Sequence, residues 1–246
     1  SINFETYPTG AIANGYDGWQ TTNPAWDQTV QTANAISGNQ SWRMSNNVAS
    51  GSFGDQPYTP ALSQKAGSLE TNKFFQADWL WSGVAGGKAG EGIVVSMDNG
   101  TGQRGTWLRM SNVGGIDTGW QIDVFDYDGT GFVNTVLASN INAGAVNKLG
   151  FDVTFNSGTL NDEFNVYIND VAVYTGIGWE DYFIDSSEGV ISYDRLLFRA
   201  GGSPTVGAVG VMFDEINYST SAVPEPATLT ILGLAALAAA RKRKQK

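Results

Sequence analysis

The sequence predicts an all-β fold, a sandwich or a barrel, and three observations favour it. Short runs rich in Trp, Tyr, Phe, Val and Thr are separated by clusters of Gly, Asn and Asp, which is typical of such folds. Hydrophobic residues make up 41% of the 246 residues, which is enough for a buried core. The main body has no sustained apolar period of 3.6 residues, so amphipathic helices are not expected there.

The clearest strands are residues 148–155 and 164–168, in which apolar and polar residues alternate. Asn169 and Asp170 follow directly and predict a two-residue hairpin turn, because both side chains tolerate a positive φ. In chain order we expect strands at residues 2–5, 26–33, 41–45, 73–81, 92–98, 105–111, 119–126, 131–138, 148–155, 163–168, 171–175, 194–200 and 208–218.

The order of three features resembles the concanavalin A-like jelly roll of laminin-G and lectin type. They are Phe4-Glu5 with Gly18-Trp19 soon after, the hairpin at residues 164–174, and a closing strand at residues 211–218. The resemblance spans nearly all of residues 1–219 and implies two packed antiparallel sheets, with the first and last strands paired. No internal repeat or linker precedes residue 219, so we expect one domain at 1–219 and a tail at 220–246.

The tail has three parts: Pro224-Glu225-Pro226, an uncharged segment at 227–240, and a basic end at 241–246. The prolines keep the backbone extended and accessible to a processing enzyme. As a helix, the uncharged segment would span only about 21 Å of a roughly 30 Å hydrocarbon core. It lacks the polar face that a buried amphipathic helix would have.

This order resembles the PEP-CTERM sorting signal. The resemblance implies an apolar sorting helix, transient insertion into the inner membrane, and cleavage by an exosortase near Pro224-Glu225-Pro226. It also implies delivery to the cell surface or extracellular matrix. Because residues 1–5 have neither a basic region nor an apolar run, we expect the export peptide to lie outside this numbering.

Charge and composition exclude several classes of function. Residues 1–222 hold 9 Lys or Arg and 23 Asp or Glu, a net charge of −14, which is unfavourable for binding DNA or RNA. With no Cys and no His, the chain has no disulfide framework, Cys-based zinc site, Cys nucleophile or Ser-His-Asp triad.

Calcium is the metal that this composition favours, because Ca²⁺ takes oxygen ligands. In the family that the chain resembles, carboxylates on the first and last strands often share a structural Ca²⁺, and Glu5 and Asp214 match those places. The alternative is that both are edge-strand carboxylates in water. Residues 126–129, Asp-Tyr-Asp-Gly, resemble half of a calcium loop, and an ordinary acidic turn is the alternative there.

A carbohydrate-binding face is the second expectation. On three expected strands, alternation places polar or aromatic residues on one side. These residues would form a single surface if the strands are neighbours in one sheet. An aromatic platform with amides, carboxylates and a guanidinium suits a sugar, whereas a solvated outer face is the alternative. The expected residues are Gln76, Asp78, Trp107, Arg109, Gln121 and Asp123. The aromatic loop at 178–183 is a further candidate, unless its rings pack back onto the sandwich.

Three functions remain open from the sequence. We expect an exported surface or matrix protein with a non-catalytic, carbohydrate-binding sandwich, and a matrix protein without a small ligand is also compatible with the tail. The enzyme alternative is a polysaccharide lyase or glycoside hydrolase that acts on an acidic glycan. The Glu-x-Asp-x-x-Glu pattern of jelly-roll glycosidases is absent, while Arg109, Gln121 and Tyr127 match part of a lyase set that often includes His.

Overall fold

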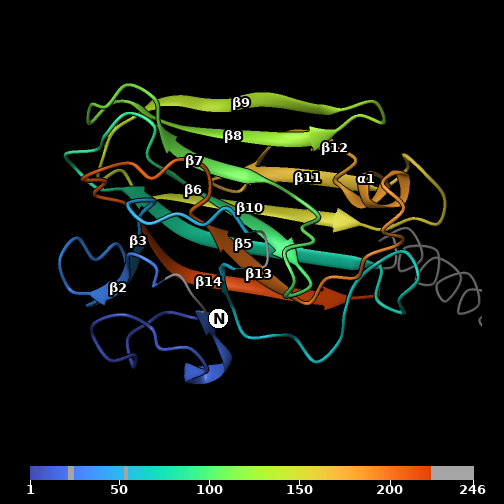
Figure 1. Cartoon of the computed structure of the whole chain (residues 1–246), viewed down its shortest axis with the longest axis horizontal. Helices are drawn as coiled ribbons and strands as arrows, with labels where there is room; N and C mark the ends of the chain where they lie inside the picture. The colour runs from blue at the N-terminus through green and yellow to red at the C-terminus, as the bar shows by residue number, and fades with distance from the viewer. Residues whose placement is uncertain (22–24, 53–54, 223–246) are drawn as a thin grey trace, which may run out of the picture.

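In the computed structural model of the chain, which describes residues 1–21, 25–52 and 55–222, the strands form two antiparallel sheets of seven strands each (Figure 1). The first, sheet I, has β9 at one edge and the short strand β1 at the other. In spatial order it consists of β1 (Gln20–Thr21), β4 (Pro57–Tyr58), β13 (Arg195–Arg199), β6 (Gly92–Asp98), β7 (Leu108–Asn112), β8 (Trp120–Tyr127) and β9 (Phe132–Ile141).

The second sheet, sheet II, has the hairpin β11–β12 at one side and β2 at the other edge. Its spatial order is β12 (Val171–Gly176), β11 (Glu163–Ile168), β10 (Asn147–Thr154), β5 (Phe74–Gly83), β14 (Val211–Ser221), β3 (Ser41–Met44) and β2 (Gln28–Gln31). Outside the sheets lie a 3₁₀ turn, η1 (Tyr16–Gly18), and one short helix, α1 (Glu180–Asp185), within the described residues.

This architecture confirms the expected all-β sandwich of two antiparallel sheets. The hairpin turn is also confirmed, since Asn169 and Asp170 have φ angles of 51° and 64°. The expected strand at residues 2–5 is wrong in extent. Ile2 forms a single antiparallel bridge with Ile216 of β14, and the chain then leaves the extended conformation at Phe4, whose φ is 60°.

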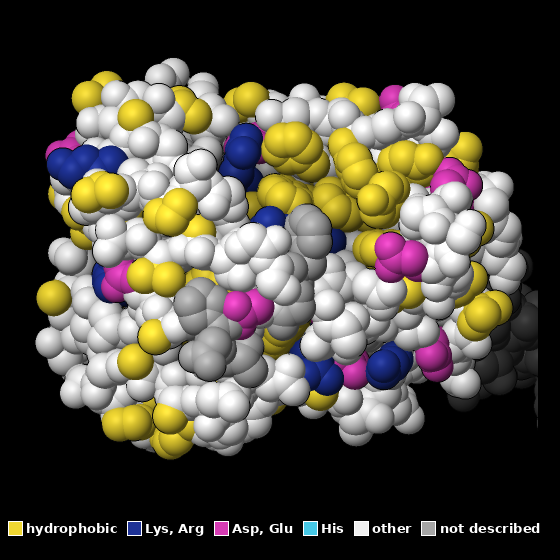
Figure 2. Space-filling model, viewed as in Figure 1, with side chains coloured by type: hydrophobic (Ala, Val, Ile, Leu, Met, Phe, Trp, Pro, Cys, Tyr) yellow, Lys and Arg dark blue, Asp and Glu magenta, His cyan; other side chains and the backbone are white. Residues whose placement is uncertain are grey.

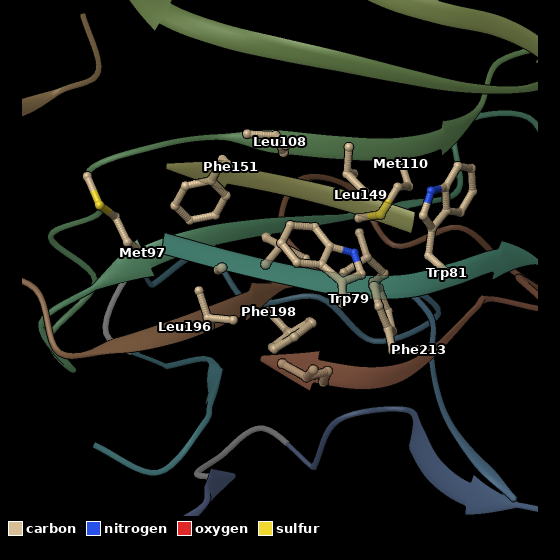
Figure 3. Close-up of a cluster of buried hydrophobic side chains, with 14 of the residues drawn as sticks. Trp79, Trp81, Met97, Leu108, Met110, Leu149, Phe151, Leu196, Phe198 and Phe213 are labelled. Atoms are coloured by element: carbon tan, nitrogen blue, oxygen red, sulfur yellow. The ribbon is translucent and has the colours of Figure 1, made fainter. Parts of the chain in front are cut away.

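The core fills the space between the sheets with aromatic, leucine and methionine side chains (Figure 3). Trp79 of β5 meets Phe151 of β10 edge to face, with ring centroids 6.2 Å apart. Gly83 is needed for close packing, because a Cβ at this position would lie 2.2 Å from the ring of Trp120. Seven of the eight tryptophans are buried, and Trp107 is the exception.

The apolar sorting helix expected at residues 227–240 lies outside the described residues. Among residues 1–21, 25–52 and 55–222, no helix has the length and apolar character required to cross a membrane.

Candidate functional site

The outward face of sheet I carries the half-buried tryptophan, Trp107. Alternation along β7 turns Leu108 and Met110 into the core, where both are fully buried, and leaves Trp107 and Arg109 on the outward side. The same alternation on β8 buries Ile122 and leaves Gln121 and Asp123 outward. These face assignments confirm those expected from the sequence.

Two hollows meet at Trp107 and together form what we call the groove. In Figure 2, hydrophobic side chains gather in a hollowed area of this face, with Lys or Arg side chains beside them. The aromatic hollow measures about 670 Å³ and is lined by Thr101, Gly102, Gln103, Arg104, Trp107, Phe125, Phe132, Trp179, Tyr182, Phe183 and Glu188. The arginine hollow measures about 480 Å³ and is lined by Asn46, Gly90, Gly92, Val94, Trp107, Arg109, Ser111, Asn112, Val113, Arg199, Gly201 and Gly202.

Direct cross-strand pairing spaces the charged groups of the arginine hollow. Arg199 of β13 pairs with Val94 of β6, Val94 pairs with Arg109 of β7, and Arg109 pairs with Asp123 of β8. Because neighbouring strands lie about 4.8 Å apart, the Cα atoms of Arg199 and Arg109 are roughly 10 Å apart. Arg199 and Arg109 therefore lie on the same face of sheet I.

Asp123 fixes the orientation of Arg109. Its Oδ1 accepts from Nε of Arg109 at 3.0 Å, and its Oδ2 lies 2.8 Å from Nη2, so the ion pair has two contacts. Asp123 is 0% exposed, whereas the side chain of Arg109 is 33% exposed. The buried carboxylate thus holds a guanidinium that still faces solvent.

Two further arginines stack on the tryptophan. The guanidinium carbons of Arg104 and Arg199 lie 5.0 and 5.3 Å from the ring centroid of Trp107, within the range of a cation–π contact. Burial lowers the pKa of Arg104 to about 9, and the charge of Arg199 adds to the effect. Burial also lowers the pKa of Arg199. Three of the five arginines in residues 1–222 therefore border the groove of a domain whose net charge is strongly negative.

The far wall of the aromatic hollow comes from the segment around α1. Trp179 donates from Nε1 to the carbonyl of Phe125 at 2.8 Å, and its backbone N–H donates to the carbonyl of Gly105 at 3.0 Å. The ring of Phe132, from the edge strand β9, lies 4.4 Å from that of Trp179 and 4.8 Å from that of Tyr182. The loop at 178–183 thus packs onto the sandwich and also forms a wall of the groove.

Buried carboxyl groups lie behind this wall. Glu180 accepts from the hydroxyl and the backbone N–H of Ser68, and Asp181 accepts from the backbone N–H of Leu160. Burial raises the pKa of Asp162 to about 8, with the neighbouring Glu180 adding to the effect, and burial also raises the pKa of Glu180. At neutral pH the pair therefore retains a proton that links the two carboxyl groups.

The six residues expected to line one face do not do so. Trp107, Arg109, Gln121 and Asp123 lie together on sheet I, but Gln76 and Asp78 are on β5, which belongs to sheet II. Gln76 and Asp78 instead border a small hollow of about 120 Å³ on that sheet, beside Lys148 and Tyr167. Strand neighbours are set by long-range pairing, which the alternation within one strand does not reveal.

The two expected calcium ligands lie close together at the Ile2–Ile216 bridge. Glu5 accepts from the side-chain amide of Asn39 and from the backbone N–H groups of Asn39 and Gln40, and these bonds lower its pKa. Asp214 is fully buried and accepts from the hydroxyl of Ser41 at 2.5 Å. Burial raises the pKa of Asp214 to about 6, and the nearby charges of Glu215 and Glu5 add to the effect.

The negative charge of the carboxylates at this position favours a bound cation. Within the described residues, Glu5, Asp214 and Glu215 form no ion pair with Lys or Arg. No group of three or more carboxylates there is arranged to hold a metal by itself. A Ca²⁺ ion would therefore take two carboxylates and complete its shell with neutral oxygens, which its chemistry permits.

Two candidates remain, the half calcium loop at 126–129 and the lyase set of Arg109, Gln121 and Tyr127. Asp128 accepts from the backbone N–H groups of Thr130 and Gly131, so residues 126–129 lead into an ordinary acidic turn. Gln121 and Tyr127 are six residues apart on one extended strand and therefore roughly 20 Å apart, too far to act with Arg109 on one bond.

Sequence reasoning missed Arg104, Arg199, Phe125 and Phe132, whereas Tyr182 lies in the aromatic loop that was a candidate. A signal existed for Arg199, because Leu196 and Phe198 alternate with Leu197 and Arg199 on an expected strand and assign Arg199 to the outward face. Arg104 lies in a loop, and no periodic pattern predicts its approach to Trp107.

Comparison with known proteins identifies the tail and the fold. Residues 222–244 match the PEP-CTERM protein-sorting motif, so the protein is exported and processed at its C-terminus. No curated protein sequence matches the chain.

Solved structures that resemble the chain include the alginate lyase Aly36B in complex with alginate trisaccharide, with a TM-score of 0.56 and 15% identity over 91% of this chain and 98% of that one. The binding domain of Paraclostridial Mosquitocidal Protein 1 gives a TM-score of 0.51 and 11% identity over 92% of this chain and 49% of that one. A sialidase gives a TM-score of 0.50 and 12% identity over 89% of this chain. The chain spans only 18% of the sialidase. At these identities the likeness shows the jelly-roll fold.

Proposed function

We propose that the exported domain binds an acidic polysaccharide in the groove on sheet I, without catalysing its cleavage. The observation that carries this proposal is the gathering of Arg104, Arg109 and Arg199 around Trp107, in a domain that is otherwise acidic. A polyanion approaching this domain is repelled by most of the surface and attracted at the groove.

The arginine hollow offers groups that recognise a uronate. The fork of a guanidinium matches the two oxygens of a carboxylate, and Arg109 is already oriented by Asp123. Ser111, Asn46 and Asn112 also line this hollow and add a hydroxyl and two amides to its guanidinium groups. The face of the Trp107 indole supplies an apolar platform for the sugar ring.

The sorting motif supports delivery of this site to the place where such a polymer is found. We propose that residues 1–219 form the delivered domain and that the tail at 220–246 inserts transiently into the inner membrane. An exosortase would then cleave at Pro224-Glu225-Pro226, leaving the domain at the cell surface or in the extracellular matrix. A structural Ca²⁺ held by Glu5 and Asp214 would neutralise the carboxylates at the junction of the chain's first and last segments.

A polysaccharide lyase is the second candidate. The similarity to a lyase that was solved with alginate trisaccharide favours it, together with arginines able to neutralise a uronate carboxylate. The tyrosine of such a lyase would be Tyr182, because Tyr182 borders the groove. Ultraviolet absorbance of unsaturated uronate products, followed during incubation with alginate, separates the two: release of product shows a lyase, and binding without product supports a binding module.

The test of binding removes the guanidinium without leaving a buried charge. In Arg109→Gln with Asp123→Asn, an amide pair replaces the ion pair, and calorimetry should show at least tenfold weaker binding of alginate. Arg43→Gln with Asp27→Asn is the matched control, because it removes an equivalent pair outside the groove, at β3 of sheet II. Equal alginate binding by the parent and the groove variant would contradict the proposal.

A further inference from the structure

The two halves of the groove differ in chemistry, and this difference specifies the ligand further. The arginine hollow presents guanidinium groups, a hydroxyl and amides. The aromatic hollow presents six aromatic rings, from Trp107, Phe125, Phe132, Trp179, Tyr182 and Phe183. Trp107 belongs to both, so one ligand can contact both halves.

The rings of the aromatic hollow support one another. Trp107 lies 5.5 Å from Trp179 and 5.7 Å from Phe125, and Phe132 closes the side formed by β9. Phe132 is 42% exposed although it contacts three other rings, so part of its apolar surface faces solvent. Two of the polar groups at the border already bond to each other, since Gln103 donates to Glu188 at 2.7 Å.

An unsubstituted sugar ring is a poor occupant of this half. A pyranose carries hydroxyl groups around its edge, and burying them against apolar walls without hydrogen bonds is unfavourable. A volume of about 670 Å³ is within the range that accommodates a whole small ligand. An apolar group larger than a methyl would use this surface without leaving polar atoms unpaired.

We infer that the aromatic hollow binds an apolar acyl group that is esterified to the acidic polysaccharide. The inference rests on the proposed function, because the carboxylate of the same polymer occupies the arginine hollow across Trp107. The preferred ligand is thus an acylated uronate polymer, and the acyl chain distinguishes it from the unmodified polymer.

Alginate esterified on its hydroxyl groups tests this inference, because its carboxylates remain free. Calorimetry with the full chain compares unmodified, acetylated and butyrylated alginate at the same degree of substitution. Affinity should rise in that order, by up to about fourfold for each CH₂ group that becomes buried. The heat-capacity change of binding should become more negative in the same order, as burial of apolar surface requires.

Two variants of β9 test whether the aromatic hollow causes the preference for acylated alginate. Phe132→Ala should reduce the ratio of affinities for butyrylated and unmodified alginate to near one. Val133→Ala is the matched control on the same strand, because Val133 borders a different hollow, and it should keep the ratio of the parent. A melting curve for each variant checks that the fold is retained.

The possible outcomes separate this inference from the proposed function. If unmodified alginate binds and depends on the Arg109–Asp123 pair but acylation changes neither affinity nor heat capacity, the inference is wrong and the proposed function stands. An equal ratio in Phe132→Ala and the parent also overturns the inference. If no form of alginate binds, both fail.

Discussion

The indole rings of Trp107 and Trp179 stack, with centroids 5.5 Å apart and planes inclined by 24°. Trp107 precedes β7 in sheet I, and Trp179 directly precedes α1 in a connection between β12 of sheet II and β13 of sheet I. The contact therefore joins the floor of the groove to its wall. Substitutions of Trp107 and of the carboxyl groups behind α1 are therefore both expected to change ligand binding.

Trp107→Ala should weaken binding of alginate by about tenfold or more, because loss of a central aromatic contact commonly costs roughly 2 kcal/mol. Its effect on the free energy of unfolding should be smaller than the roughly 3–5 kcal/mol expected when a core tryptophan is removed. Calorimetry and chemical denaturation measure the two effects.

Two control variants are compared with Trp107→Ala, one for binding and one for stability. Tyr16→Ala removes an exposed ring that lines neither hollow of the groove and should leave binding unchanged. Trp42→Ala removes a fully buried ring and defines the cost of a core tryptophan. If Trp107→Ala destabilises the domain as much as Trp42→Ala does, Trp107 acts mainly in the core.

Calcium should raise the melting temperature. If Glu5 and Asp214 bind Ca²⁺ only in the folded state, a free concentration of about 100 times the dissociation constant stabilises the domain by roughly 2.7 kcal/mol. Glu5→Gln should abolish the rise, while Glu163→Gln, at an exposed position on β11, should retain it. A melting temperature that responds to neither calcium nor a chelator would count against the site.

Stability should fall as pH rises from about 4 to about 8. Asp162, with a pKa raised to about 8, and Asp98 and Asp214, with pKa values raised to about 6, stay protonated in the folded state at pH values where the unfolded groups have ionised. The folded state then binds more protons, so each increase in pH favours unfolding over this interval.

Thermal melts in the presence of a chelator test this pH dependence. Asp162→Asn should flatten the decline between about pH 6 and 8, because the amide keeps the shape of the protonated acid and does not ionise. Asp170→Asn, in the exposed hairpin turn, is the control and should retain the slope of the parent. A slope that is the same in Asp162→Asn and the parent would contradict the raised pKa.

The tail should be absent from the exported form. In the native host, the intact mass of the released protein should correspond to a chain that ends near residues 222–225. Replacement of Pro224, Glu225 and Pro226 by Ala should retain the basic end at 241–246. Recovery of unaltered protein outside the cell with residues 241–246 attached would argue against processing.

Local patterns in the sequence predicted the strands and their faces. Leu108 and Met110 on one side and Trp107 and Arg109 on the other follow from the two-residue period of a strand, which depends only on the backbone. Asn169 and Asp170 predicted their turn because the required positive φ is a property of single residues. The three-part order of the tail is likewise contained in consecutive residues, and the sorting motif at 222–244 confirms it.

Only the tertiary structure decided which strands are neighbours. It separated Gln76 and Asp78 from Arg109 by placing β5 in sheet II, and it brought Arg199 into one cross-strand row with Arg109. It also placed Trp179 against Trp107 through a loop that no periodic pattern describes. The physical reason is that alternation fixes the side of a strand on which a residue lies, whereas the pairing of strands depends on packing across the whole domain.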